Sequence, residues 1–211
     1  MNNLLKVLLG IVGVVIAGVV ILVIIFKIEM APDSAKEEEI INDANQYLHD
    51  HFSEGYEVYD ALYDNMGNFE FEYAAKVRNT KNGVNFLIYR LSTTGTLVDS
   101  YVAEKWTKEL ENNTRNYLND HFPQMHIYHA SIGRGIGKNL GIDPERAGSY
   151  KENGDSVKPH INIMVSREHS EHDEEKLNDF ISYLKNEEKI EHGTVALSYM
   201  TEKGEIIETE I

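Results

Sequence analysis

The chain has 211 residues, no cysteine, and a formal net charge of −15 from 35 acidic and 20 basic residues. Without cysteine there can be no disulfides, thiolate zinc sites or cysteine nucleophiles. All the acidic residues and 18 of the basic ones follow Lys27, so the remaining 184 residues carry about −17. This disfavours a nucleic-acid partner, which requires a basic surface, and the length suits one domain or two small ones.

An apolar segment, Val7–Phe26, contains no charged or strongly polar side chain. A helix of this length covers about 30 Å, the thickness of the hydrocarbon core of a bilayer, so the segment predicts a transmembrane helix. A cleaved signal peptide is the main alternative. Its apolar region usually runs about 7–15 residues and ends at a small-residue cleavage site, whereas this run ends at Phe26-Lys27-Ile28-Glu29. We therefore expect an uncleaved single-pass anchor in the lipid bilayer.

The direction of this anchor depends on the positive charges at its two ends. Lys6 and the α-amino group precede it, while Lys27 and Lys36 follow it, which is nearly a tie. The tail of residues 1–6 is short, and the cations on the far side stand among acidic residues. We favour a cytoplasmic tail, a cell-membrane location and an extracytoplasmic C-terminal domain. A cysteine-free exported domain suits a bacterium with a single membrane.

After a tether at residues 27–35, residues 36–102 are predicted to form a first module of one helix and an antiparallel meander. Ser34 and Glu37 form a capping-box pattern before a helix that is expected to end near Phe52–Gly55. Strands are expected at residues 56–63, 68–77, 84–91 and 96–102. The 68–77 segment alternates apolar and polar residues, as a strand with one solvated face does, and Asn82-Gly83 is a strong hairpin signal.

Residues 103–211 are predicted to form a second module of helix plus antiparallel sheet, which makes the whole fold α+β. Its helices are expected from about Ala103 and at 173–188, and its strands at 125–132, 159–165, 194–201 and 205–211, the last two as a hairpin. A long Gly-rich loop covers residues 133–158.

An internal repeat links the two modules. The segment Tyr47–Phe52 recurs seventy residues later as Tyr117–Phe122, with five of six positions identical, and the similarity continues from Val58–Ala61 to Ile127–Ala130. We interpret the repeat as two related modules. No residue signature connects the chain to a known family.

The Gly-rich loop is the preferred candidate for a functional surface, because Gly-rich backbone with Arg134 and Lys138 can bind an anion such as phosphate, carboxylate or a lipid headgroup. The loop does not match a P-loop, since Ile132 replaces the first glycine and Asn139 replaces the Ser or Thr that holds magnesium. A mobile loop without a ligand is the alternative.

Histidines give two weaker candidates. His51 and His121 of the repeat could form a paired pH-sensing or metal site, or could each lie on the buried stripe and close a helix by bonding a free carbonyl. His169 and His172 beside Asp173 could hold zinc, although the acids of that run also suit a first helical turn. We prefer the structural interpretation in both cases, so no metal, cofactor or catalytic residue is expected.

These patterns favour a membrane-anchored extracytoplasmic protein with a non-enzymatic interaction or regulatory role, and an envelope protein is the expected class of partner. The second hypothesis is a sensor of a ligand or metal ion that uses the Gly-rich loop or the histidines. An enzyme acting on cell-envelope material is third, because the chain has no Gly-x-Ser-x-Gly and no other catalytic constellation.

Overall fold

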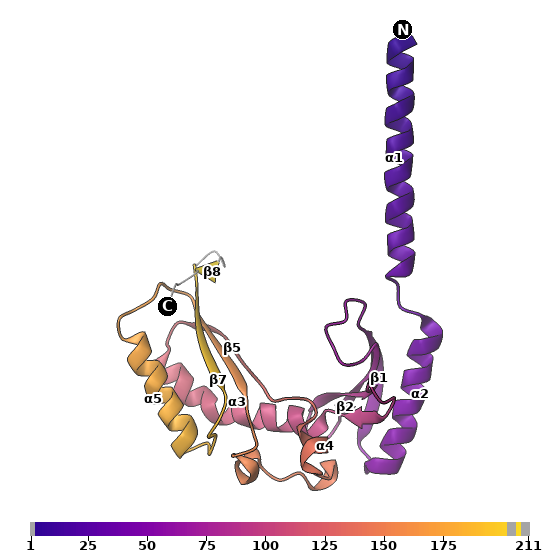
Figure 1. The fold of residues 1–211 in the computed structure, drawn as a ribbon. Coiled ribbons are helices and arrows are strands. Elements are labelled where there is room, and N and C mark those ends of the chain that lie inside the picture. The colour runs from indigo at the N-terminus through magenta and orange to yellow at the C-terminus, as the bar shows by residue number, and fades with distance from the viewer. Residues whose placement is uncertain (1–2, 202–205, 208–211) are drawn as a thin grey trace.

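A computed structural model of the chain describes the backbone of residues 3–201 and 206–207, and the side chains of residues 12–26 and 30–201. The described part is an α+β fold with two four-stranded sheets, as the sequence predicts. Helix α1 (Asn3–Glu29) projects away from the rest of the molecule, and α2 (Ser34–His51) follows after a short link (Figure 1).

The predicted membrane span, Val7–Phe26, falls within α1, and its described side chains, from Val12 to Phe26, are exposed. Within the described part of the chain, no helix is both long and apolar enough to cross a membrane. The predicted span therefore gains no support from the described residues, and the side chains of its residues 7–11 lie outside them.

The first sheet is the predicted antiparallel meander, with strand order β1-β2-β3-β4. Its strands are β1 (Tyr56–Tyr63), β2 (Tyr73–Asn79), β3 (Asn85–Arg90) and β4 (Leu97–Asp99). Helix α2 covers one face of this sheet because its apolar residues recur at helical spacing and bury the stripe Ile40, Ala44 and Leu48.

Two local predictions for this part of the chain are wrong. Strand β2 begins at Tyr73 and not at residue 68, because the buried carboxylate of Asp64 accepts hydrogen bonds from the backbone N–H of Met66 (3.2 Å) and Phe69 (2.6 Å) and holds the intervening chain as a loop. Helix α2 is capped by Asp33, whose side chain accepts from the N–H of Ala35, in place of the predicted Ser34.

The remaining elements build the second sheet, with order β5-β6-β7-β8, and the helices around it. In chain order they are α3 (Tyr101–His121), β5 (Met125–Ser131), α4 (Ile136–Leu140), the 3₁₀ turns η1 (Pro144–Arg146) and η2 (Tyr150–Asn153), β6 (His160–Val165), α5 (Asp173–Asn186), β7 (Thr194–Met200) and β8 (Ile206–Ile207).

The prediction that this second sheet is antiparallel throughout is wrong. Strands β6 and β7 are parallel, because α5 carries the chain back across the sheet before β7 begins. A parallel pair requires such a crossover, whereas a hairpin gives an antiparallel pair. The pairs β5–β6 and β7–β8 are antiparallel, as predicted.

The Gly-rich loop also differs from a mobile loop, since it contains α4, η1 and η2. Its residues Ala147, Tyr150 and Val157 are buried in the core of the second sheet, and the indole N–H of Trp106 donates to the carbonyl of Gly148 at 3.0 Å. The loop is thereby attached to α3.

Helix α3 joins two separate cores. Tyr101 packs with α2 and the first sheet, while Val102 and the residues that follow it pack with the second sheet and α5. Trp106, Leu110 and Leu118 are fully buried on the stripe that the sequence predicts. Since α3 belongs to both cores, it fixes where the Gly-rich loop lies relative to the first sheet.

Candidate functional site

A cavity of about 770 Å³ lies between the first sheet and the Gly-rich loop, and we call it the Arg134 pocket. The first sheet and the loop before β2 contribute Phe69, Tyr89 and Asp99 to its lining, and the Gly-rich loop contributes Arg134, Lys138 and Lys158. Arg134 lies in the turn before α4 and Lys138 lies within α4, and both line the same hollow.

The three cations of the Arg134 pocket have no ion-pair partner among the described residues. The guanidinium of Arg134 lies 4.6 Å from the ring centroid of Phe69, which is a cation–π contact. Burial raises the pKa of Glu104 on α3, and the charge of Arg134 opposes that rise.

The acidic residues of the pocket already have hydrogen-bond donors. Asp99 accepts from the hydroxyl of Tyr47 and from the N–H of Tyr101, both at 2.9 Å. Burial raises the pKa of Asp99, and these two hydrogen bonds oppose the rise. Glu70 accepts from the hydroxyl of Tyr89. The pocket therefore contains cations that have no ion-pair partner among the described residues, beside carboxylates that already accept hydrogen bonds from the protein.

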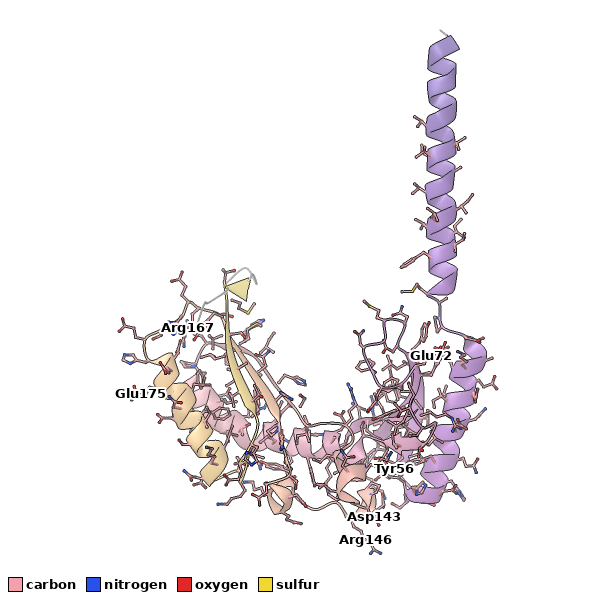
Figure 2. The ribbon with its side chains drawn as sticks, in the orientation of Figure 1. Tyr56, Glu72, Asp143, Arg146, Arg167 and Glu175 are labelled. Atoms are coloured by element: carbon pink, nitrogen blue, oxygen red, sulfur yellow. The ribbon has the colours of Figure 1, made fainter. Side chains whose placement is uncertain are left out.

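The position of the Gly-rich loop is fixed by Glu145 of η1. Its carboxylate accepts hydrogen bonds from the hydroxyls of Ser53 (2.6 Å) and Tyr56 (2.7 Å) at the start of the first sheet, and these bonds lower its pKa. Figure 2 shows Tyr56 close to the turn that carries Asp143 and Arg146. These two hydrogen bonds connect the Gly-rich loop to the first sheet, and both of these segments line the Arg134 pocket.

Sequence reasoning named Arg134 and Lys138 and missed the other members of the pocket. Phe69 falls in the segment 68–77 that the sequence predicts as a strand, although it belongs to the loop that Asp64 organises. Lys158 stands at the far end of the Gly-rich loop, just before β6. Its positive charge in an otherwise acidic chain is the sequence signal that could have identified it. Nothing in the local sequence marks Asp99, because its role depends on contacts with Tyr47 and the loop.

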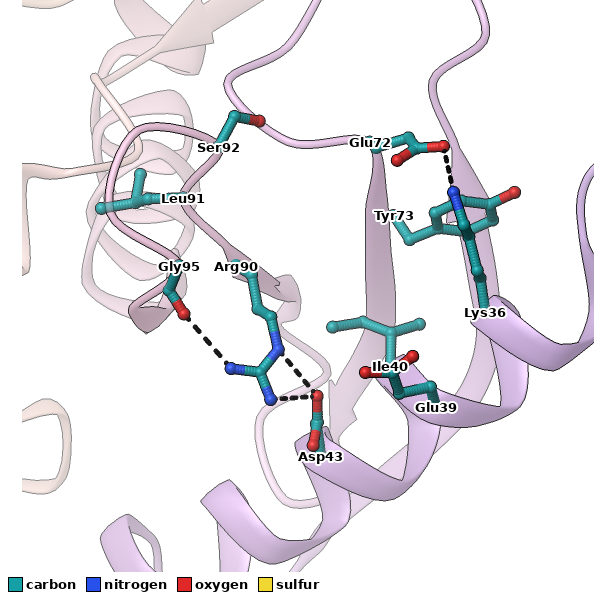
Figure 3. Close-up of a pocket in the computed structure, with 10 residues that line it drawn as sticks. All are labelled: Lys36, Glu39, Ile40, Asp43, Glu72, Tyr73, Arg90, Leu91, Ser92 and Gly95. Carbon is teal, nitrogen blue, oxygen red and sulfur yellow. Dashed lines mark hydrogen bonds and ion pairs between the residues drawn. The ribbon is translucent and has the colours of Figure 1, made fainter.

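A second hollow of about 310 Å³ lies between α2 and the first sheet (Figure 3). Its charges are paired within the protein. Lys36 Nζ lies 2.8 Å from a carboxylate oxygen of Glu72, and the guanidinium of Arg90 donates to Asp43 at 2.6 and 2.9 Å and to the carbonyl of Gly95 at 3.2 Å. These pairs attach α2 to the sheet, and they leave little unpaired charge for a ligand.

The repeated histidines are not brought together, since α2 and α3 end on different sides of the molecule (Figure 1). Both His51 and His121 are exposed, so the prediction that they lie on the buried stripe is wrong. They stack on Tyr47 and Tyr117 with ring centroids 4.4 and 4.0 Å apart. His121 Nδ1 lies 2.8 Å from the carbonyl oxygen of Tyr117, which confirms the predicted helix-closing contact at this residue.

The cluster at the start of α5 is organised around an ion pair. The guanidinium of Arg167 donates two hydrogen bonds to the buried carboxylate of Asp173, and the N–H of Ser170 donates a third. Burial raises the pKa of Asp173, but these bonds outweigh it and lower the pKa to about 2. His172 faces Glu175 at 4.0 Å on the surface, and Figure 2 labels Glu175 and Arg167 at this end of the molecule. Across the described residues, no three His, Asp or Glu side chains are placed to hold a metal ion.

Comparison of the chain with family models, curated proteins and solved structures gave no match. A function for this protein must therefore be argued from the geometry and charge of its own sites. Of the hollows described above, the Arg134 pocket is the one that combines the larger volume with unpaired charge.

Proposed function

We propose that this protein is a membrane-anchored, extracytoplasmic binding module that takes an anionic ligand in the Arg134 pocket. The observation that carries the proposal is the convergence of Arg134, Lys138 and Lys158 on one cavity without ion-pair partners among the described residues. Three like charges in one concave site repel one another and focus a positive potential there. A bound anion relieves that repulsion, and it finds this potential in a chain whose net charge is −15.

The residues of the pocket favour binding over catalysis. Its described lining contains no histidine, and its two carboxylates, Glu70 and Asp99, are occupied as acceptors for tyrosine hydroxyls. A general base must reach a substrate proton, and each of these carboxylates already accepts a hydrogen bond from a hydroxyl of the protein. We therefore keep a non-enzymatic role as part of the proposal.

The membrane part of the proposal rests on the apolar sequence Val7–Phe26. From Val12 to Phe26 the described apolar side chains are exposed, and an apolar surface of this extent in water favours association with lipid or protein. Carbonate extraction of the expressed chain should leave it in the membrane fraction. Protease added to intact spheroplasts should then digest the C-terminal domain, and a protected domain would reverse the proposed orientation.

The ligand proposal is tested on the full-length chain purified in detergent, by thermal unfolding and calorimetry with phosphate or citrate as the probe. Binding to the native state raises the melting temperature, so we expect millimolar citrate to raise it for the wild type. The triple variant R134Q/K138Q/K158Q should lose this rise. K176Q, which removes one cation from α5, is the control and should keep it. Equal rises in the wild type and the triple variant would overturn the proposal, and so would no rise in either.

A further inference from the structure

Strand β4 is an outer strand of the first sheet, and among the described residues no strand lies on its other side. The N–H of Leu91 bonds the carbonyl of Thr96 at 3.0 Å, and the N–H of Ser100 bonds the carbonyl of Leu87 at 2.9 Å. Because hydrogen-bonded pairs alternate along an antiparallel ladder, the N–H and C=O of Leu97 point away from β3. No described group bonds them.

Three neighbouring hollows follow this free edge. The Arg134 pocket shares Val98, Asp99 and Lys138 with a hollow of about 200 Å³, and that hollow shares Tyr47, Thr96 and Leu97 with a third of about 420 Å³. We call the three together the β4 groove. Because they succeed one another along a strand edge, an extended ligand fits them better than a compact one.

The charges of the β4 groove differ from end to end. Arg134, Lys138 and Lys158 line one end and have no ion-pair partner among the described residues. At the other end, Asp43 is paired with Arg90 and Asp50 lies 2.9 Å from His49 Nδ1. Between the two ends lies Leu97, with its outward backbone N–H and C=O. A ligand that complements the whole groove has backbone N–H and C=O groups in its middle and negative charge at one end.

The edges formed by β1 and β5 lack this opening. Strand β1 is interrupted by an irregularity between Val58 and Asp60, which is one way in which proteins block edge pairing. At β5, the N–H groups of Ala130 and of Ile132, which follows the strand, are bonded by side chains of α3. Strand β4 contains no proline, no lysine and no irregularity.

We infer that the β4 groove binds an extended peptide whose backbone pairs with the free edge of β4 and whose acidic end lies among Arg134, Lys138 and Lys158. Strand addition of this kind draws affinity from main-chain hydrogen bonds and selectivity from flanking side chains. The inference rests on the proposed function and names the class of its ligand.

The first test measures binding of a fluorescein-labelled peptide, Gly-Thr-Val-Thr-Val-Glu-Glu with a free C-terminus, to the full-length chain in detergent by fluorescence anisotropy. A peptide with Lys-Lys in place of Glu-Glu tests the charged end. Two copies N-methylated at alternate residues, one on the odd-numbered and one on the even-numbered positions, test the backbone pairing. We expect both changes to weaken binding at least tenfold. If the N-methylated copies bind as tightly as the parent peptide, the inference is wrong.

The second test removes one backbone donor of the protein. Leu97→Pro deletes the outward N–H at an edge position where proline is tolerated, and Leu97→Ala removes the side chain but keeps the N–H, which makes it the matched control. We expect L97P to bind the peptide at least tenfold more weakly than L97A, with circular dichroism showing that both are folded. Equal affinities of the two variants would contradict strand addition.

These tests distinguish peptide binding in the β4 groove from anion binding in the Arg134 pocket, on which it rests. If citrate still stabilises the wild type in a manner that depends on the three cations while no peptide binds, the inference fails and the anion site stands. If neither citrate nor the peptide binds, both fail.

Discussion

The carboxylate of Glu111 on α3 accepts a hydrogen bond of 2.9 Å from the backbone N–H of Ala130 on β5. One helical turn earlier, the hydroxyl of Thr107 accepts from the N–H of Ile132 at 3.1 Å. Both donors lie at the outer edge of the second sheet. Helix α3 therefore closes this edge with its side chains, in the place where another strand would otherwise pair.

Replacing Glu111 by alanine should destabilise the protein, because the N–H of the fully buried Ala130 would lose its acceptor. The loss expected for a buried unsatisfied group is about 1–3 kcal/mol in urea unfolding. Glu111→Gln keeps an acceptor oxygen at the same place and should retain most of the stability. Equal losses in the two variants would mean that the charge of Glu111 matters and that the hydrogen bond does not.

Acid should weaken the fold through Asp173. Its folded pKa, about 2, lies below the unfolded value near 3.9. The stabilisation is therefore complete above about pH 5 and is lost as the pH falls through the folded pKa. The shift corresponds to roughly 2 kcal/mol. The difference in unfolding free energy between the wild type and Asp173→Asn should shrink by that amount from pH 5 to pH 2. A constant difference would show that Asp173 does not titrate as described.

Anion binding in the Arg134 pocket should strengthen as the pH falls, because the pKa of Asp99 is raised by burial. Protonation of Asp99 removes a negative charge from the lining of the pocket. With sulfate as the probe, we expect this protonation to raise the affinity roughly two- to fivefold, at a pH above the ordinary range of an aspartate carboxyl. In Asp99→Asn, which keeps an acceptor for Tyr47, this part of the pH dependence should disappear. A rise of the same size in that variant would assign it to another group.

The repeated segments Tyr47–Phe52 and Tyr117–Phe122 should owe their similarity to packing. Phe122 is 1% exposed in the core of the second sheet, whereas His121 is exposed. Phe122→Ala should therefore cost about 3–5 kcal/mol of unfolding free energy, and His121→Ala less than about 1 kcal/mol. The opposite order, measured by urea unfolding, would indicate that the histidine carries a role of its own.

The elements that the sequence predicts well are those whose determinants are close in the chain. Trp106, Leu110 and Leu118 recur at helical spacing, so α3 and its buried stripe can be read directly from the sequence. Arg134 and Lys138 are four residues apart, and one short turn leading into α4 is enough to place them together. The repeat at Phe52 and Phe122 marks two helix ends for the same reason.

The elements that the sequence does not decide depend on contacts between distant segments. The parallel pairing of β6 with β7 follows from how α5 packs back on the sheet, and the amino-acid pattern of each strand is compatible with either direction. Phe69, Asp99 and Lys158 meet Arg134 only because α3 belongs to both cores and Glu145 binds the first sheet. Local periodicity thus fixes helices and hairpins by short-range sterics and burial, whereas the pocket and the free edge of β4 exist only once long-range packing has placed the two sheets.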